Sequence, residues 1–504
     1  MLSLIIFLPL LGAIVIGLTP ANRVALIRGF ALVFSGVALV LSVVLYFSFN
    51  YHQTGLQFVE KATWVSLPSI GVNYFVGVDG LNLPMVLLTT LLTVMAVLAS
   101  WRMEVRPKAY FLLLLLLETG VSGVFASMDF FLFFLFWEVE LIPMYLLIGI
   151  WGGPRREYAA IKFVIYTLAG SALMLVGIMA LYFTSNPHTF DMTVLAHQKY
   201  PLSFVIWVTM LFFVGFAVKL PSFPFHTWLP DAHVQAPTAV SVLLAGVLLK
   251  MGGYGMLRVL VGILPDGVHY WAPLFAVLAV ISVLYGACIS MVQTDLKSMV
   301  AYSSVSHMGY VLLGVAAFST ISLNGAAIQL FTHGTITGLL FLLVGNLYDK
   351  AHTRTISDFG GIAKKMPLLA TLFMMAGLAS LGLPGMSGFI AEFTTFIGAY
   401  PNLPAYTILS AAAIVITAGY ILWMMRRVFF GTFNEKWEHL VDARGIEIVP
   451  LATLMGIIVL VGVYPSILTN VINSGVAPLT SQAHLATPNL ASSLASVSGF
   501  WRLP

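Results

Sequence analysis

The stretch FAVKLPSFPFHTWLPDAHVQAPTAVSVLLAGVLLKMGGYG (216–255) contains the features that decide the fold. It belongs to a long apolar region, yet it has two prolines near its start and two lysines among apolar residues. Proline removes a backbone donor and interrupts a helix, and a lysine within a membrane span is costly unless it faces protein or water. We therefore expect interrupted membrane helices that carry ionisable groups on an internal path.

The composition of the whole chain is typical of a polytopic membrane protein. Of the 504 residues, 60% are apolar and only 8% are charged, whereas soluble domains average about a quarter charged residues. A hydrocarbon core about 30 Å thick requires about 20 apolar residues per helix. The sequence predicts an all-α membrane protein of about 14 transmembrane helices, at 2–19, 24–47, 81–100, 109–127, 130–150, 158–184, 203–232, 238–262, 270–292, 298–317, 323–347, 366–400, 403–425 and 448–471.

Basic residues are unevenly divided between the two sets of connections. If the N-terminus lies outside, seventeen of the 23 Lys and Arg residues fall on inner connections. This asymmetry follows the positive-inside rule, and it predicts both termini on the outer side of the membrane. The outer connections hold Lys61, Lys199, Arg258 and Arg502, and the two basic residues left inside spans are Lys219 and Lys250.

Several classes of function are excluded by what the sequence lacks. The one cysteine, Cys288, cannot form an internal disulfide or supply the thiolates of an iron–sulfur cluster. The basic residues are spread along the sequence, so nucleic acid is not an expected partner. There is no phosphate-binding motif of the GxxxxGK[ST] type, and energy for transport must therefore come from an ion gradient or a partner.

Two spans are too long to be plain helices. The run 203–232 contains Pro221 and Pro224, and the run 366–400 contains LGLPGMSG (381–388). We expect the seventh and twelfth helices to break there, and breaks five spans apart are typical of inverted repeats. The expected division is helices one to three at 1–108, a first five-helix antiporter-like repeat at 109–262, a second, inverted repeat at 263–430, and helix fourteen with an outer C-terminal tail at 431–504.

At least four ionisable residues within the predicted spans require an explanation: Glu138, Lys219, Lys250 and Glu392. Burial favours the neutral form of each group, so a buried lysine can release a proton and a buried carboxylate can retain one. The alternative is static ion pairing that only fixes helix packing. We predict a line of proton-carrying groups across the membrane, with Glu138 paired to Lys219 across the fifth and seventh helices.

Two further carboxylates lie in the same part of the sequence. Glu140 is two residues from Glu138 and points about 200° away around a regular helix. We therefore expect that Glu140 does not share the role of Glu138. Glu118, near the middle of the fourth span, has no role that the sequence assigns.

Four histidines accompany the buried charges: His226, His233, His307 and His333. Imidazole can pass a proton in either direction near neutral pH, so we predict that they act as a proton relay. No two of them have the i, i+3 or i+4 spacing on one helix that favours a metal site. Haem held by a facing pair such as His307 and His333 is the alternative that spacing leaves open.

Four stretches of the sequence are distinctive together: FLFFLFWEVELIPMYLLIGIWGG (131–153), the opening stretch 216–255, QTDLKSMVAYSSVSHMGYV (293–311) and LYDKAHTR (347–354). The most specific feature is WLPDAHVQAPT with a lysine on either side. These stretches strongly resemble subunit M of the bacterial proton-pumping NADH:quinone oxidoreductase, respiratory complex I, which is an antiporter-like subunit. The D-type subunit of multisubunit sodium/proton antiporters and the membrane subunits of some hydrogenases are similar alternatives.

The resemblance implies fourteen helices, with the seventh and twelfth broken, and one proton channel in each subunit. By motif, Glu138 is the carboxylate of helix five, Lys219 its partner, Lys250 the linking lysine and Glu392 the terminal group. It also implies that partner subunits hold the flavin, the iron–sulfur clusters and the quinone site, with no cofactor and no metal in this chain. The implied neighbours are the antiporter-like subunits L and N, together with the lipid bilayer.

Overall fold

The computed structural model describes residues 1–67 and 70–486. Residue Arg502 and most of the predicted outer tail lie outside the described residues. The first half consists of α1 (Leu2–Leu18), α2 (Val24–Ser48), β1 (Gln57–Leu67), β2 (Ile70–Val78), α3 (Leu83–Ala99), α4 (Pro107–Ala126), α5 (Phe130–Val139), α6 (Leu141–Trp151), α7 (Arg156–Thr184), α8 (Met192–Leu195), α9 (Leu202–Lys219), α10 (Trp228–Gln235), α11 (Thr238–Leu243), η1 (Leu244–Leu248), α12 (Leu249–Gly255) and η2 (Met256–Val261).

The second half is helical throughout the described residues, apart from its connections. It consists of α13 (Pro265–Met291), α14 (Leu296–Ala317), α15 (Thr320–Ala351), η3 (Ile356–Asp358), η4 (Ile362–Lys364), α16 (Pro367–Ser380), α17 (Ser387–Ala399), α18 (Pro404–Val428), η5 (Glu435–Trp437), η6 (Gly445–Glu447), α19 (Ile448–Val463) and α20 (Ser466–Ala486). Five of the helices begin with proline in the first turn, where its missing N–H is not needed: α3, α4, α13, α16 and α18.

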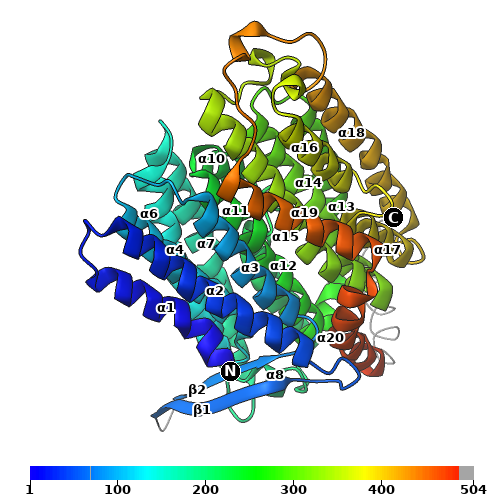
Figure 1. Cartoon of the computed structure of the whole chain (residues 1–504). Helices are drawn as coiled ribbons and strands as arrows, with labels where there is room; N and C mark the ends of the chain where they lie inside the picture. The colour runs from blue at the N-terminus through cyan, green and yellow to red at the C-terminus, as the bar shows by residue number, and fades with distance from the viewer. Residues whose placement is uncertain (68–69, 487–504) are drawn as a thin grey trace.

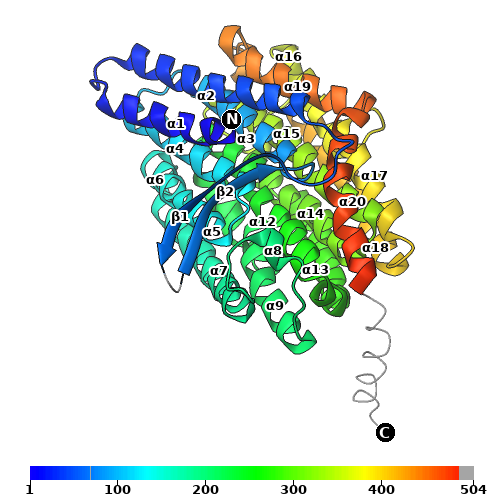
Figure 2. The ribbon, with the colours of Figure 1, turned by 90° about the horizontal axis from the view of Figure 1, so that it is seen from below.

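Most helices coincide with the predicted spans; the exceptions are α8, which lies in a predicted connection, and α20, which extends beyond the predicted end of the last span at residue 471. In the described residues, 11 helical stretches are long and apolar enough to cross a membrane, and the shorter apolar helices α1, α3 and α16 occupy the remaining predicted positions. The prediction of an all-α membrane protein is therefore confirmed. The sequence did not predict the hairpin of β1 and β2, which lies across one end of the bundle beside the N-terminus (Figure 2).

The hairpin is joined to the bundle by specific polar contacts. Its strands pair antiparallel, with Gln57 opposite Val78 at the open end. The Asn73 backbone N–H donates to the Asp129 carboxylate at 3.2 Å, and the Lys61 ammonium pairs with Asp191 at 2.7 Å. These contacts fix the hairpin against the starts of α5 and α8, because Asp129 and Asp191 are the N-caps of those helices.

Both predicted breaks are present. The seventh span is divided into α9 and α10 by non-helical residues 220–227, and the twelfth into α16 and α17 by residues 381–386. In the first break, the freed Phe223 N–H donates to the Ser282 hydroxyl at 2.9 Å. The interruption is thus satisfied by a polar side chain of α13 rather than exposed to lipid.

The centre of the bundle is formed by α12, α14 and α15 (Figure 1). The membrane-length helical stretches that contain these three helices are almost completely buried. The helices α2 and α18 lie at the flanks, where they expose apolar side chains such as Phe47 and Val415. Large exposed apolar residues on the outside of a bundle are those expected to face lipid. The helix α7 packs against both halves of the seventh span, α9 and α10, and α15 packs against both halves of the twelfth, α16 and α17, which are corresponding spans in the two predicted repeats. The repeats and the four-part division remain predictions.

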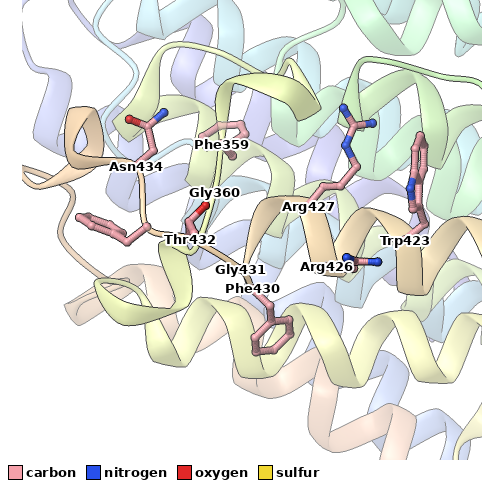
Figure 3. A pocket seen from close by; sticks show the side chains of 10 residues that line it. Phe359, Gly360, Trp423, Arg426, Arg427, Phe430, Gly431, Thr432 and Asn434 are labelled. Carbon is pink, nitrogen blue, oxygen red and sulfur yellow. The ribbon is translucent and has the colours of Figure 1, made fainter.

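The connection that follows α18 surrounds a surface hollow (Figure 3). The helix ends at Val428, and the chain then turns through residues 429–434 toward η5. The backbone N–H of Asn434 donates to the Gly360 carbonyl at 3.1 Å. This hydrogen bond holds the turn against the segment that connects α15 to α16.

The two capping carboxylates under the hairpin differ in their protonation. Burial raises the pKa of Asp129 to about 6, although hydrogen bonds from backbone N–H groups, first that of Asn73, oppose the rise. Burial alone would also raise the pKa of Asp191, but hydrogen bonds from Lys61 and Thr193 and the charge of Lys61 hold it below its usual range. Near neutral pH, Asp129 is therefore the more readily protonated of the two.

We predict that Asp129→Asn reduces the pH dependence of stability between about pH 4.5 and pH 6.5. An acid with a higher pKa in the folded state than in the unfolded state stabilises the fold when protonated, so this contribution is lost as pH rises from about 4 to about 6. The full effect of Asp129 is about 3 kcal/mol for a pKa of about 6. Thermal melting of the detergent-solubilised protein at both pH values measures it, with the exposed Glu104→Gln as control. An unchanged pH dependence in Asp129→Asn would contradict the assignment.

Candidate functional site

A buried ion pair joins the fifth and seventh spans. The Lys219 ammonium, in the last turn of α9, bonds to a carboxylate oxygen of Glu140, and both side chains are buried. The same ammonium lies 5.6 Å from the centre of the Trp137 ring and 5.4 Å from that of Phe163. The lysine thus has a carboxylate and two aromatic faces around it.

The predicted partner of Lys219 was wrong. The structure pairs Lys219 with Glu140 rather than with Glu138. The expected angular separation holds, because Glu140 is fully buried whereas Glu138 is half-buried on another side of the helix. Glu140 lies at the junction of α5 and α6, three residues before Pro143, which cannot donate the helical hydrogen bond of that turn. That proline was the signal in the sequence for a kink at Glu140.

Two more carboxylates lie on the helices beside the pair. Neither carboxylate oxygen of Glu118, on α4, has a hydrogen-bond partner among the described residues, and Glu118 is buried. One oxygen of Glu138, on α5, is also buried without a partner there. Because α4 packs against both α5 and α6, this part of the bundle holds two carboxylates besides the one that pairs with Lys219.

Lys250 lies at the centre of the molecule, between two stretches of π-helix. The stretches are η1 before it and η2 after it, and such wide turns leave carbonyl groups available to other donors. The Lys250 ammonium donates to the Ala245 carbonyl of η1, and it lies 2.8 Å from Nδ1 of His333. The side chain of Lys250 is fully buried, so its partners are those of the protein interior.

A line of polar groups continues from Lys250 to the second helix break. The rings of His333, on α15, and His307, on α14, have their centres 5.7 Å apart. Nδ1 of His307 lies 3.0 Å from a Glu392 carboxylate oxygen, and its Nε2 lies 3.2 Å from the Ser380 hydroxyl. The predicted residues Lys250, His333, His307 and Glu392 are thus consecutive neighbours across α12, α15, α14 and α17.

The break itself determines where Glu392 can lie. Gly382 has a φ of +81°, and a Cβ at this position would lie 2.9 Å from a Glu392 carboxylate oxygen. Only glycine has both the required backbone conformation and the required space. The LGLPGMSG motif therefore shapes the backbone around the carboxylate as well as ending α16.

The other two predicted histidines lie at the first break and on α10. His226 packs against the Tyr285 ring with centres 5.0 Å apart, and its Nδ1 is buried without a partner among the described residues. His233 stacks on the ring of Phe341, and neither of its ring nitrogens has a hydrogen-bond partner among the residues that the structure describes. Lys297 is near His233, because its ammonium donates to the Ala236 carbonyl at 2.5 Å. From the sequence, Lys297 was expected on an inner connection, and its burial was missed.

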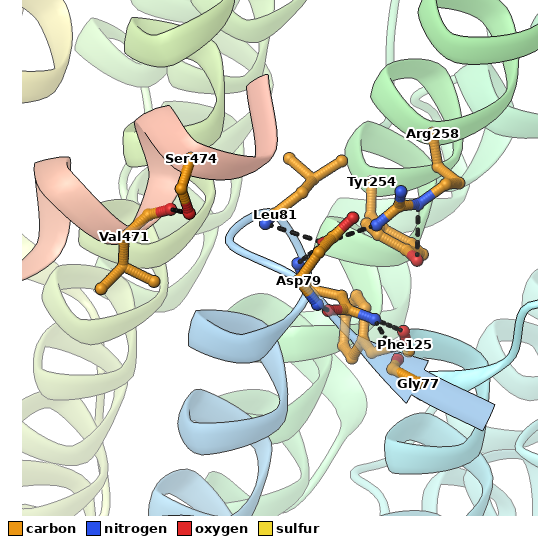
Figure 4. Close-up of polar contacts among 9 residues, drawn as sticks. Gly77, Asp79, Leu81, Phe125, Tyr254, Arg258, Val471 and Ser474 are labelled. Atoms are coloured by element: carbon orange, nitrogen blue, oxygen red, sulfur yellow. Dashed lines mark hydrogen bonds and ion pairs between the residues drawn. The ribbon is translucent and has the colours of Figure 1, made fainter. Parts of the chain in front are cut away.

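A second buried ion pair lies on the helix of Lys250, near the hairpin (Figure 4). Nη2 of Arg258 donates to Asp79 at 2.7 Å, and its Nε donates to the Tyr254 hydroxyl at 3.1 Å. Lys250, Tyr254 and Arg258 are spaced four residues apart along this helix. The sequence predicted Arg258 on an outer connection, and its ion pair was missed because Asp79 is 179 residues away in the sequence.

The loop that carries Asp79 is clamped between helices. Asn82 donates to the carbonyls of Gly77 and Phe125 at 2.9 and 2.8 Å. A Cβ on Gly80 would lie 1.8 Å from the Val471 carbonyl of α20, so only glycine fits there. The loop therefore connects the hairpin, the Lys250 helix and α20 through one polar cluster.

The described residues contain no group of three or more His, Cys, Asp or Glu side chains that could hold a metal ion. Three of the four ring nitrogens of His307 and His333 already contact Lys250, Glu392 or Ser380. Axial ligation of one haem by this pair would have to displace these contacts. The geometry favours proton exchange between neighbours over metal binding.

Comparisons with known proteins agree with this architecture. Residues 127–417 match the family described as "NADH:quinone oxidoreductase/Mrp antiporter, TM". The protein is 44% identical over 494 residues to NAD(P)H-quinone oxidoreductase chain 4 2 of Synechococcus sp. (strain JA-3-3Ab), over 93% of this chain and 92% of that relative. It is 41% identical over 482 residues to the chloroplastic chain 4 of Mesostigma viride, covering 93% and 94% of the two proteins.

Solved structures show the same fold. A subunit of respiratory complex I from Thermus thermophilus with bound NADH superposes with a TM-score of 0.86 at 31% identity, over 95% of this chain and 100% of that one. A subunit of the Mrp complex from Dietzia sp. DQ12-45-1b gives a TM-score of 0.84 at 22% identity, over 95% and 97%. The second likeness shows the fold alone.

The fold and the buried polar line define an antiporter-like membrane subunit. The matches over nearly the whole sequence are more specific. The protein belongs to the chain 4 (subunit M) family of NAD(P)H-quinone oxidoreductases, the membrane subunits of complex I.

We predict that Glu140→Gln destabilises the protein more than Glu138→Gln does. The first change leaves Lys219 buried without its carboxylate, which costs about 3–5 kcal/mol if the lysine stays charged. The second leaves the pair intact. Denaturation in detergent measures both, and the double variant Glu140→Gln/Lys219→Met should recover part of the loss. Equal losses in the two single variants would contradict the pairing.

We also predict that Arg258→Met destabilises the cluster at the hairpin. Asp79 would remain largely buried without its guanidinium partner, with an expected cost of about 3–5 kcal/mol. The matched control is Lys365→Met, because the Lys365–Glu438 pair is exposed and should contribute less than about 1 kcal/mol. Unfolding measurements that give equal effects for the two variants would show that the buried pair is not important for stability.

Proposed function

We propose that this subunit moves protons across the membrane through its buried lysines, histidines and carboxylates. The observation that carries the proposal is the unbroken line of neighbours from Lys250 through His333 and His307 to Glu392. Proton transfer between side chains needs such contacts, and a line that ends at a helix break reaches a region where the backbone can be hydrated. A static packing role would require no such continuity.

The route that we propose begins at the inner side. A proton enters by His226 and His233, loads Lys250, and leaves outward by His333, His307 and Glu392. Lys297 extends the entry side, since it reaches the end of the helix that carries His233. Lys162 and Asp231, paired at 2.7 Å on α7 and α10, form the inner edge of this side.

The ion pair of Lys219 and Glu140 acts as the switch. At an effective dielectric near 20, a unit charge about 4 Å away is worth about 4 kcal/mol, or roughly a thousandfold in a protonation equilibrium. Because α9, which ends at Lys219, packs against α12, opening or closing the pair changes the electrostatic potential at Lys250. Glu138, on α5, is a further carboxylate that can take up or release a proton.

The energy comes from redox chemistry in partner subunits. The relatives are named as chains of NAD(P)H-quinone oxidoreductase, and we propose that this subunit serves such an enzyme without a redox group of its own. The flavin, iron–sulfur clusters and quinone then belong to other subunits, and the antiporter-like subunits L and N are the direct neighbours. We propose a location in a bacterial inner membrane, and the charge asymmetry of the connections supports both termini on its outer side.

A sodium/proton antiporter subunit is the second candidate. The favouring observation is the shared fold with a subunit of the Mrp complex. The higher identity to the quinone oxidoreductase subunits supports the first proposal. Proton uptake by vesicles in sodium-free buffer distinguishes the two, since the antiporter requires sodium on the opposite side.

The test of the proposal compares Lys250→Ala with Lys250→Arg in the whole complex. Arginine keeps the charge but does not release its proton, so both variants should lose most of the proton transfer that accompanies NADH oxidation. Membrane vesicles that report NADH oxidation and proton uptake together provide the measurement. Normal pumping by Lys250→Arg would mean that Lys250 is a fixed electrostatic element and not a proton carrier.

A further inference from the structure

A basic hollow lies at the end of α18, away from the polar line of the membrane interior. Its volume is about 650 Å³. Arg426 and Arg427 project from the last turn of the helix, and the turn through Gly431 and Thr432 that follows completes this part of the lining (Figure 3). Nothing in the proposed proton route uses this hollow.

The two arginines have no acidic partner within the described residues. Neither forms an ion pair with a carboxylate there, and Arg427 contacts the face of Trp423, at 4.5 Å from the ring centre. The positive-inside rule by itself explains arginines at this end of a helix. It does not explain two adjacent guanidinium groups beside a hollow.

The turn that follows the helix adds neutral donors. The backbone N–H groups of Gly431 and Thr432 make no hydrogen bond to a backbone or side-chain acceptor among the described residues. Thr432 also lines the hollow, whereas the Asn434 amide already bonds to the Asp358 carbonyl and the Lys436 N–H. Guanidinium groups together with free backbone N–H groups are the donor set that binds phosphate oxygens.

The hollow continues into a surface that faces lipid. Trp423 is 45% exposed and Phe430 is 46% exposed beside it, and Leu422, Val415 and Leu409 are exposed along the same helix. Tryptophan is enriched where a membrane protein meets the headgroup layer. A ligand with a phosphate and acyl chains could place its phosphate in the hollow and its acyl chains along α18. A free phosphate would use only the hollow.

We propose that this hollow binds the headgroup of an anionic phospholipid, with Arg426 and Arg427 holding the phosphate and the acyl chains lying along α18. Each basic residue near an anionic membrane surface contributes about a factor of five. Removing both arginines should therefore weaken retention of the lipid roughly 30-fold.

The experiment uses the intact complex in nanodiscs of phosphatidylcholine with a minor fraction of phosphatidylglycerol. Phosphatidylglycerol that stays with the complex after transfer to detergent is counted by mass spectrometry. The variant is Arg426→Gln/Arg427→Gln. The matched control is Arg23→Gln/Lys436→Gln, which removes two exposed charges outside the hollow. NADH oxidation by each complex shows that the variants are assembled.

Selective loss of phosphatidylglycerol from the arginine variant, with the control like the wild type, is the expected result. Equal losses in both double variants would show that diffuse charge holds the lipid, and would overturn the site. No preference of the wild type for phosphatidylglycerol over phosphatidylcholine would also overturn it. Displacement of the lipid by millimolar inorganic phosphate would overturn the lipid assignment too, because the hollow would then be a site for soluble anions.

Discussion

The whole structure depends on the cost of placing ionisable groups in a medium of low polarity. A charged side chain at the centre of a bilayer requires a partner, a polar cavity or a change of protonation. Here Lys219, Lys250 and Glu392 are each buried, and each contacts another polar group of the protein. The central helices are accordingly surrounded by other helices, and the apolar flanks are left to face lipid.

Each helix break has two effects on the polar groups around it. They free backbone groups that a regular helix would use internally, and they open space beside a charged residue. Lys219 ends the helix before the first break, and Gly382 in the second break gives the Glu392 carboxylate its space. The π-helical turns around Lys250 act similarly, since they make the Ala245 carbonyl available to the lysine ammonium.

Much of the fold could be predicted from the sequence, because apolar runs and Pro/Gly clusters act locally. The runs indicated the helices, and KLPSFPF and LGLPGMSG indicated the breaks. The partner of Lys219 could not be predicted, since helix geometry puts Glu138 and Glu140 on different sides of the helix but does not show which side faces the seventh span. The Arg258–Asp79 pair joins segments 179 residues apart, and a single sequence contains no signal for that contact. The hairpin was missed because its residues form no apolar run of membrane length.

The central claim is that protons pass between His333 and Glu392 by way of His307. The most direct measurement is the number of protons moved per NADH oxidised by vesicles that contain the complex with His307→Gln. Glutamine can keep hydrogen bonds to Glu392 and Ser380, but it cannot carry an extra proton. The account predicts a lower proton-to-NADH ratio with the complex still assembled. An unchanged ratio would contradict it, because the line from Lys250 to Glu392 has no other link at that point among the described residues.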